Sequence, residues 1–195
     1  MTMAKVRRAM ALYRPEVIEN DGKRHAAVAA IFHEDAAGVR LLFIERARCE
    51  GDPWSGHIAF PGGGMEAQDA DARAAAERET LEEIGLDLRT ADYLGRLDDV
   101  TGATLPVRVS GFVYGVGETP DRFAINHEVR EVFWAPVGKL LRPERRVTLR
   151  VRFGGQEQVR PGIDLLGPGR PVLWGITYRF VTRFLEILGC EIPVR

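Results

Sequence analysis

The sequence has little cysteine and none of the close cysteine and histidine spacings that hold zinc. Among its 195 residues only Cys49 and Cys190 carry thiols. Two thiols so far apart in the chain are typical of a protein from a reducing cytoplasm, where disulfides are rare. A zinc site would need a Cys-x-x-Cys pair or a Cys/His cluster. We therefore expect a cytoplasmic protein with free thiols and no zinc.

Long apolar runs and an excess of basic charge are also missing. No uninterrupted apolar run approaches the ~20 residues that cross a bilayer, and Met1–Arg8 is not followed by the apolar core of a secretion signal. The formal charge of −1 and the pI near 6.4 leave no global basic surface for nucleic acid. With 45% hydrophobic residues, the chain suits one well-buried core. We expect a single domain over residues 1–195 that binds neither nucleic acid nor membrane.

Hydrophobic periodicity and turn residues predict a mixture of strands and a few helices. The expected strands are 25–33, 39–46, 93–97, 107–116, 129–134, 146–153 and 156–160, and the expected helices are 4–12, 70–84 and 173–188. Gly154-Gly155 is the strongest hairpin signal, and the Gly- and Pro-rich stretch 162–171 is expected to be a loop. Strands interleaved with helices favour a mixed sheet covered on both faces.

The most specific feature is a glycine loop followed by a helix rich in glutamate. If Asp69 caps that helix and Gly85 ends it in the left-handed conformation, the helix covers residues 70–84. Leu81 and Ile84 then give it an apolar stripe that anchors it on a core. The sequence thus predicts that the glutamates of this segment are carried on one continuous helix.

Three glutamates of the loop-and-helix segment 61–86 fall on one face of that helix. Glu79, Glu82 and Glu83 lie at i, i+3 and i+4, within an arc of roughly 100°. Carboxylates this close repel one another unless a cation lies among them, and hard oxygen ligands suit Mg²⁺ or Mn²⁺. A solvated helix face would also explain the glutamates. The glycine run before the helix and Arg78, one turn before Glu82, weigh against that alternative.

These residues resemble the signature of the Nudix hydrolases. That signature is a glycine, five residues, a glutamate, seven residues and then Arg-Glu-apolar-x-Glu-Glu-x-Gly-apolar. The Arg-Glu, Glu-Glu and Gly-Leu steps are present between Arg78 and Leu86. Three features depart from the pattern: Asp69 replaces a glutamate, eight rather than seven residues separate it from Arg78, and Thr80 occupies an apolar position. The resemblance implies an α/β fold, the Nudix α/β/α sandwich with a mixed β-sheet. It also implies a phosphoric anhydride hydrolase that needs Mg²⁺ or Mn²⁺.

The departures are themselves similar to the coenzyme A pyrophosphatase branch of that family. Phe60–Gly63 matches its Phe-Pro-Gly-Gly opening, and Glu66 and Asp69 fall on matching positions. Weaker matches follow in the family's order at Leu41-Leu42, Arg46-Ala47, Leu94-Gly95, Asp98, Thr101-Gly102, Glu128-Val129, Val132-Phe133, Pro136 and Leu173–Thr177. The similarity covers most of the chain.

The segment just before that opening departs in a way that concerns the substrate. It is one residue longer than the branch pattern, with Arg48 and His57 as stand-ins for an arginine and a histidine. The insert Gly51–Ser55 is turn-prone and carries Trp54, which either stacks on a base or packs in a core. Coenzyme A is therefore one of several substrates that the sequence allows.

The chemistry expected of such a site follows from charge. Divalent cations held by Glu79, Glu82 and Glu83 would neutralise a diphosphate and acidify a water for attack on one phosphorus. The candidates for the base are Glu82, Glu83 and Glu128, the last in loop 121–128, where a surface acid is the alternative. The candidate substrate-binding residues are Arg46, Trp54, Gly62 and Gly63. Arg46 and Arg48 are candidate contacts to a phosphate or to the substrate, and exposed arginines at a strand end are the alternative.

Three functions agree with these observations. The first is a diphosphatase acting on coenzyme A or its thioesters, and the second is the same reaction on ADP-ribose or another nucleoside diphosphate derivative. The third is a Nudix-like module that binds a nucleotide without catalysis, which the intact carboxylate cluster disfavours. The expected partner is a small-molecule nucleotide or coenzyme A, and a homodimer is an open possibility.

Overall fold

The computed structural model describes residues 1–19, 22–51, 54–102, 106–153 and 156–190. Its helices are α1 Met3–Leu12, α2 Ala72–Ile84, α3 Val137–Leu140 and α4 Gly175–Ile187, with 3₁₀ turns at Leu88–Thr90 and Pro143–Arg145. Its strands are β1 Arg24–Asp35, β2 Gly38–Arg46, β3 Ile58–Ala59, β4 Gly62–Gly64, β5 Asp92–Arg96, β6 Val100–Thr101, β7 Val107–Val116, β8 Val129–Pro136, β9 Arg146–Phe153, β10 Gln156–Ile163 and β11 Leu173–Trp174.

The described strands form two sheets. The larger one has the order β3-β2-β1-β7-β5, with β4 also paired to β1, β6 to β7 and β8 to β2. Strands β1 and β7 are parallel, whereas the other pairs are antiparallel. The sheet is therefore mixed, as predicted. Strands β11, β10 and β9 form a smaller antiparallel sheet, which we call the accessory sheet.

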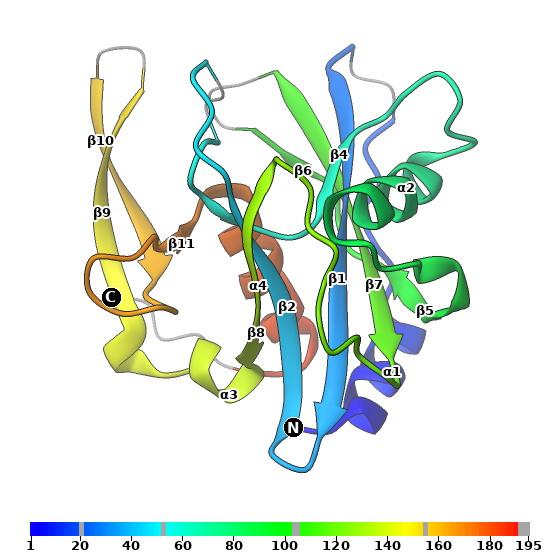
Figure 1. Ribbon diagram of the computed structural model, residues 1–195. Helices are drawn as coiled ribbons and strands as arrows, with labels where there is room; N and C mark the ends of the chain where they lie inside the picture. Colours follow the sequence, from blue (N-terminus) through cyan, green and yellow to red (C-terminus); the bar gives the residue numbers. More distant parts are fainter. Residues whose placement is uncertain (20–21, 52–53, 103–105, 154–155, 191–195) are drawn as a thin grey trace.

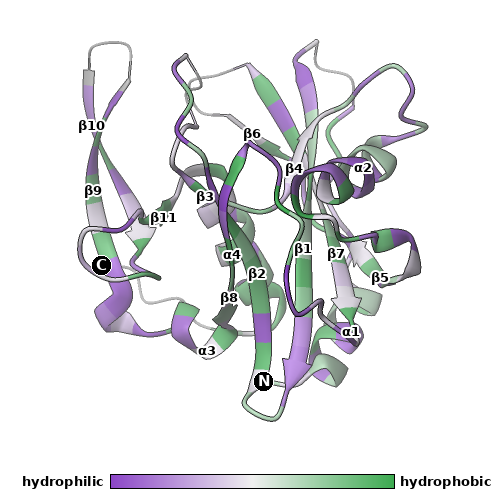
Figure 2. Cartoon of the chain, in the orientation of Figure 1, coloured by the Kyte–Doolittle hydropathy of each residue, from purple (hydrophilic) through white to green (hydrophobic). Residues whose placement is uncertain are grey.

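Helices cover both faces of the larger sheet, which gives the α/β/α layers expected from the sequence (Figure 1). Because successive side chains of a strand point to opposite faces, β1 serves two cores. Ala29 and Ile31 pack with the α2 side, whereas Phe32 stacks on Phe184 of α4 with ring centroids 4.5 Å apart. Figure 2 shows hydrophobic residues along the central strands and polar residues over much of α2. Helix α2 is thus held at the surface with its glutamates beside the sheet.

The start and the apolar face of α2 differ from the prediction. Asp71, not Asp69, caps the helix, because its carboxylate accepts the backbone N–H of Ala74 at 2.8 Å. Leu81 is exposed, so the predicted stripe with Ile84 is wrong at that position. Thr80 is fully buried instead, with its hydroxyl donating to the Ala76 carbonyl at 2.7 Å. Because Ala76 is small and the Thr80 hydroxyl is hydrogen-bonded within the helix, α2 can lie close to the sheet.

Most other predicted elements are confirmed, but the glycine run expected to lie in a loop forms strand β4, which pairs with β1. The strands at 107–116 and 146–153 have the expected bounds, and the helix 4–12 is present as α1. The predicted helix 173–188 begins later, because Leu173 and Trp174 pair with β10 as β11, and β10 extends into the expected loop as far as Ile163. The Gly154-Gly155 hairpin turn lies outside the described residues. None of the helices in the described ranges is both long and apolar enough to span a membrane.

Gly85 ends α2 in the left-handed conformation, with φ 71°, as the sequence predicts. A Cβ at this position would also lie 2.8 Å from Cβ of Ala124. We expect Gly85→Val to lower the free energy of unfolding by roughly 1 kcal/mol or more, since a β-branched residue is strained at positive φ. Chemical denaturation measures the effect. Equal stability of Gly85→Val and wild type would contradict the αL assignment.

Candidate active site

Four segments bring the candidate site together. Strand β4 pairs with β1 through Ala26–Val28, and this places the glycine run beneath the second half of α2. The last residue of β2, Arg46, approaches from one side. Loop 121–128 closes the end of α2, because Ala124 N–H donates to the Ile84 carbonyl at 3.1 Å and Asn126 N–H to the Glu83 carbonyl at 3.0 Å. The same loop delivers Glu128.

Glu83 is the most buried carboxylate of the group, with 2% of its side chain exposed. Its Oε2 accepts the Gly62 N–H at 2.9 Å, and its Oε1 lies 3.6 Å from Nη1 of Arg46. Burial raises the pKa of Glu83 to about 8, although the Gly62 N–H and Arg46 act in the opposite direction. An anionic Glu83 is therefore costly in this position unless further positive charge is nearby.

Arg46 links two of the candidate carboxylates. Its Nη2 lies 3.7 Å from Oε2 of Glu128, while its Nη1 is the atom nearest Glu83. The backbone supports this pair, since Ala47 N–H donates to the Glu128 carbonyl at 2.7 Å. Half of the Glu128 side chain is exposed. The arrangement brings Arg46, Glu83 and Glu128 together, as the sequence reasoning expected of neighbours in one site.

Glu79 faces the glycine strand. A Cβ at Gly63 would overlap the Glu79 carboxylate, so glycine here leaves the space that this side chain fills. Burial raises the pKa of Glu79, and the charges of Glu82 and Glu128 act in the same direction against the Arg78 contact. The carboxylates of Glu79, Glu82, Glu83 and Glu128 are thus electrostatically coupled.

Arg78 has a larger role than the sequence indicated. It donates to both Asp69 oxygens, at 2.9 and 3.0 Å, to the Gly64 carbonyl at 3.0 Å, and to Glu79 and Glu82 at 3.0 and 3.2 Å. The Arg78 hydrogen bonds lower the pKa of Asp69. Asp69 therefore fastens the loop to α2 through Arg78. The i, i+4 pair of Arg78 with Glu82 was predicted, whereas the bidentate Asp69 contact has no local sequence signal.

The donor set agrees in chemistry with a hard divalent cation. Every candidate ligand is a carboxylate oxygen, and burial together with neighbouring negative charge raises the pKa of Glu79 and of Glu83, which disfavours their anionic forms in the absence of added positive charge. In the described parts of the chain, no three His, Cys, Asp or Glu side chains are grouped closely enough to hold a metal ion as they stand. Arg78 and Arg46 contact these carboxylates instead. Arg78 contacts Oε1 of Glu79 and Oε2 of Glu82, one oxygen of each carboxylate.

The insert before β3 is exposed rather than part of the core. Trp54 has 37% of its surface exposed, which excludes the core-packing alternative. His57 N–H donates to the Trp54 carbonyl at 3.1 Å, and the His57 ring meets Trp174 edge-on with centroids 4.9 Å apart. Arg48 is exposed beside Gly56. Asp52 and Pro53 lie outside the described residues.

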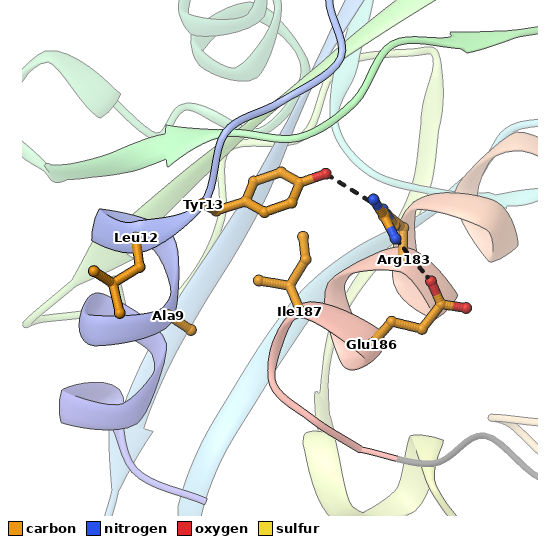
Figure 3. Close-up of a pocket in the computed structure, with 6 residues that line it drawn as sticks. All are labelled: Ala9, Leu12, Tyr13, Arg183, Glu186 and Ile187. Atoms are coloured by element: carbon orange, nitrogen blue, oxygen red, sulfur yellow. Dashed lines mark hydrogen bonds and ion pairs between the residues drawn. The ribbon is translucent and has the colours of Figure 1, made fainter.

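A pocket of about 330 Å³ lies elsewhere, between α1 and α4. Figure 3 shows the Tyr13 hydroxyl pointing toward Arg183, with Leu12 and Ile187 among the apolar walls. Tyr13 and Arg183 both bond Asp98. These helices pack against the face of the sheet opposite α2, so this pocket is separate from the carboxylate cluster.

Comparison with known proteins agrees with this geometry. The NUDIX domain model matches residues 23–152. Nudix hydrolase 22, chloroplastic, of Arabidopsis thaliana is 30% identical over 172 residues, covering 85% of this chain and 55% of that protein. The mitochondrial coenzyme A diphosphatase NUDT8 of Homo sapiens is 32% identical over 155 residues, covering 76% and 63%. These names place relatives in chloroplasts and mitochondria, so a cytoplasmic location stays a prediction.

A solved structure also supports the fold. The MutT/nudix family protein from Enterococcus faecalis superposes with a TM-score of 0.55 at 17% identity, covering 97% of this chain and 80% of that one. The chain spans about half the length of the curated relatives that it matches, between 49% and 58% for four of them. With the family model covering most of the chain and the signature glutamates of α2 in contact with the glycine strand, the chain belongs to the Nudix family.

Proposed function

We propose that this chain is a metal-dependent hydrolase that cleaves the diphosphate linkage of coenzyme A or its derivatives. The observation that carries the proposal is the convergence of Glu79, Glu83 and Glu128 on the glycine strand and on Arg46. A module that only bound a nucleotide would have no need for so many coupled carboxylates. The family membership and the name of the human relative support the same reading.

Glu79, Glu82 and Glu83 are the residues that would hold Mg²⁺ or Mn²⁺. When bound, the cation would neutralise charge on the diphosphate and acidify a water molecule. Glu128 and Glu82 are the candidates for the proton acceptor, because about half of each side chain is exposed and neither is enclosed as Glu83 is. Glu83 is assigned to metal binding rather than to proton transfer.

Arg46 and the glycine strand would bind the phosphates. Arg46 presents its guanidinium to Glu83 and Glu128, and the same N–H groups would donate to an anionic oxygen of the substrate once a bound cation offsets the negative charge of the carboxylates. Gly64 has open space around its missing side chain, so a ligand can approach the backbone there. Gly62 lets the strand lie close to Ala27 and Val28 of β1, and Gly63 leaves space for the Glu79 carboxylate.

Trp54 is compatible with a second substrate class as well as with coenzyme A, since both carry an adenine. An exposed tryptophan in the insert offers a platform on which a base can stack, and base–aromatic stacking is worth ~1–3 kcal/mol. The adenine of ADP-ribose and the adenine of coenzyme A would each be able to stack on this platform. The reaction is the same in both cases, and only the group beyond the diphosphate differs.

The test is a panel of coenzyme A, an acyl-coenzyme A, ADP-ribose and a dinucleoside polyphosphate with Mg²⁺ and with Mn²⁺, resolved by chromatography. We expect cleavage at the diphosphate of coenzyme A, giving 3′,5′-ADP and 4′-phosphopantetheine, and none after chelation of the metal. Trp54→Ala should lower kcat/KM by roughly tenfold for substrates that stack an adenine there. Preferred cleavage of ADP-ribose would select the second class, and no cleavage of any member would refute the hydrolase proposal.

A further inference from the structure

We propose that Arg170 and Trp174 are positioning residues for Arg46. Both belong to the segment that leads from β10 into α4, beyond the residues matched by the NUDIX domain model. Each contacts the end of the β2–β3 pair from which Arg46 reaches the carboxylates. The inference rests on the proposed function, in which Arg46 binds a phosphate of the substrate.

The first contact joins Arg170 to Glu45, the residue that precedes Arg46 in the sequence. The Glu45 side chain is 1% exposed, and its Oε2 accepts Nη2 of Arg170 at 2.8 Å. Arg170 also bonds Glu131 of β8, the strand that pairs with β2. The β2–β8 register shifts between Glu45 and Arg46. Arg170 therefore holds the last regular position of β2 before the irregularity that turns Arg46 toward the site.

The second contact is made by Trp174 across the strand pair. Arg46 N–H donates to the His57 carbonyl at 2.9 Å, so these two residues are bonded neighbours. The ring of His57 meets Trp174 with centroids 4.9 Å apart and planes at 64°. Trp174 is fixed in turn, because it pairs with Gly162 of β10. The two neighbours of Arg46, Glu45 and His57, are therefore contacted by Arg170 and Trp174 of the same segment.

The geometry explains how a contact outside the site can act within it. The contacts of the two residues at the strand end differ: Glu45 pairs with Arg170, whereas Nη1 of Arg46 lies 3.6 Å from Oε1 of Glu83. A strand end that is free to shift would move the Arg46 guanidinium relative to Glu83 and Glu128. Glu45 also accepts from Nη1 of Arg130 at 2.6 Å, so the buried carboxylate keeps a partner when Arg170 is removed, and we expect the fold to be retained.

The experiment compares Arg170→Ala with Arg170→Lys and with the control Arg150→Ala, an exposed arginine of β9 on the same accessory sheet. For the substrate cleaved best by the wild type, Arg170→Ala should raise KM about tenfold while kcat changes less than about threefold, as expected for weakened substrate binding. Arg170→Lys should restore part of the loss, and Arg150→Ala should match the wild type. Trp174→Leu is a second route to the same shift.

A double-mutant cycle with Arg46→Ala separates positioning from general stability. In the Arg46→Ala background, Arg170→Ala should raise KM no further, because the residue it positions is gone. An additive increase in KM would overturn the proposal. Trypsin cleavage after Arg48 gives a readout without turnover: it should be faster in Arg170→Ala than in wild type or Arg150→Ala. Unchanged cleavage would overturn the inference, whereas a wild type inactive on every substrate would refute only the proposed function.

Discussion

Glu82→Gln is expected to lower kcat/KM for the diphosphate substrate by on the order of a hundredfold or more. Glu82 has 55% of its side chain exposed and lies 3.2 Å from Nη1 of Arg78. Glutamine keeps the shape of the side chain but removes an anionic oxygen, whether that oxygen binds the cation or accepts a proton. The measurement is steady-state kinetics at saturating Mg²⁺ and at saturating Mn²⁺.

The control for this substitution is Glu144→Gln, an exposed acid in the 3₁₀ turn before β9. It removes the same charge far along the chain from the carboxylate cluster and should leave kcat/KM unchanged. Because Glu82 is largely exposed, the variant should keep the melting temperature of the wild type to within a few degrees. A folded, metal-saturated Glu82→Gln protein with full turnover would refute the assignment of Glu82 to the catalytic machinery.

The parts of the site that the sequence predicted are those decided by local rules. The spacing of Glu79, Glu82 and Glu83 follows from helical geometry, and the αL end at Gly85 follows from the freedom of glycine at positive φ. Both hold in the structure. Local rules could not show that Asp71 rather than Asp69 caps the helix, because either aspartate can do so.

That choice is decided by a residue nine positions away from Asp69. Arg78 takes both Asp69 oxygens, and Asp71 is left to accept the Ala74 N–H. Leu81 is another case of tertiary control, since the side of α2 that faces the sheet passes through Ala76 and Thr80. Local apolar spacing could not show which side the sheet would cover.

The accessory sheet illustrates the same limit. Its strands follow from alternation in the sequence, but its contact with the site depends on the pairing of Arg170 with Glu45, which are 125 residues apart. Long-range pairs of this kind have no periodic signal. The burial of Glu83 is likewise set by the approach of β4 and Arg46 rather than by its neighbours in the helix.

The glycine run before α2 should give the largest stability effect, and its three positions should respond differently to alanine. At Gly62, φ is +146°, and a Cβ would overlap the Ala27 carbonyl and lie 2.6 Å from Cα of Val28. Because both neighbours are backbone of β1, they cannot move aside without disrupting the sheet. We expect Gly62→Ala to lower the free energy of unfolding by ~3 kcal/mol, a fall in melting temperature of roughly 6–12 °C.

Gly63→Ala should instead separate activity from stability. The atoms that its Cβ would meet are the carboxylate of Glu79, the end of a flexible side chain that can swing away. We therefore expect a loss of stability under about 1 kcal/mol but a loss of kcat/KM of tenfold or more, because Glu79 leaves the cluster. At Gly64 a Cβ meets no atom within 4 Å, so Gly64→Ala is the matched control for stability. Calorimetry and kinetics on the three variants test these expectations. Equal melting temperatures for Gly62→Ala and Gly64→Ala would contradict the packing of β4 on β1. Full activity of Gly63→Ala would show that Glu79 does not need this space to function.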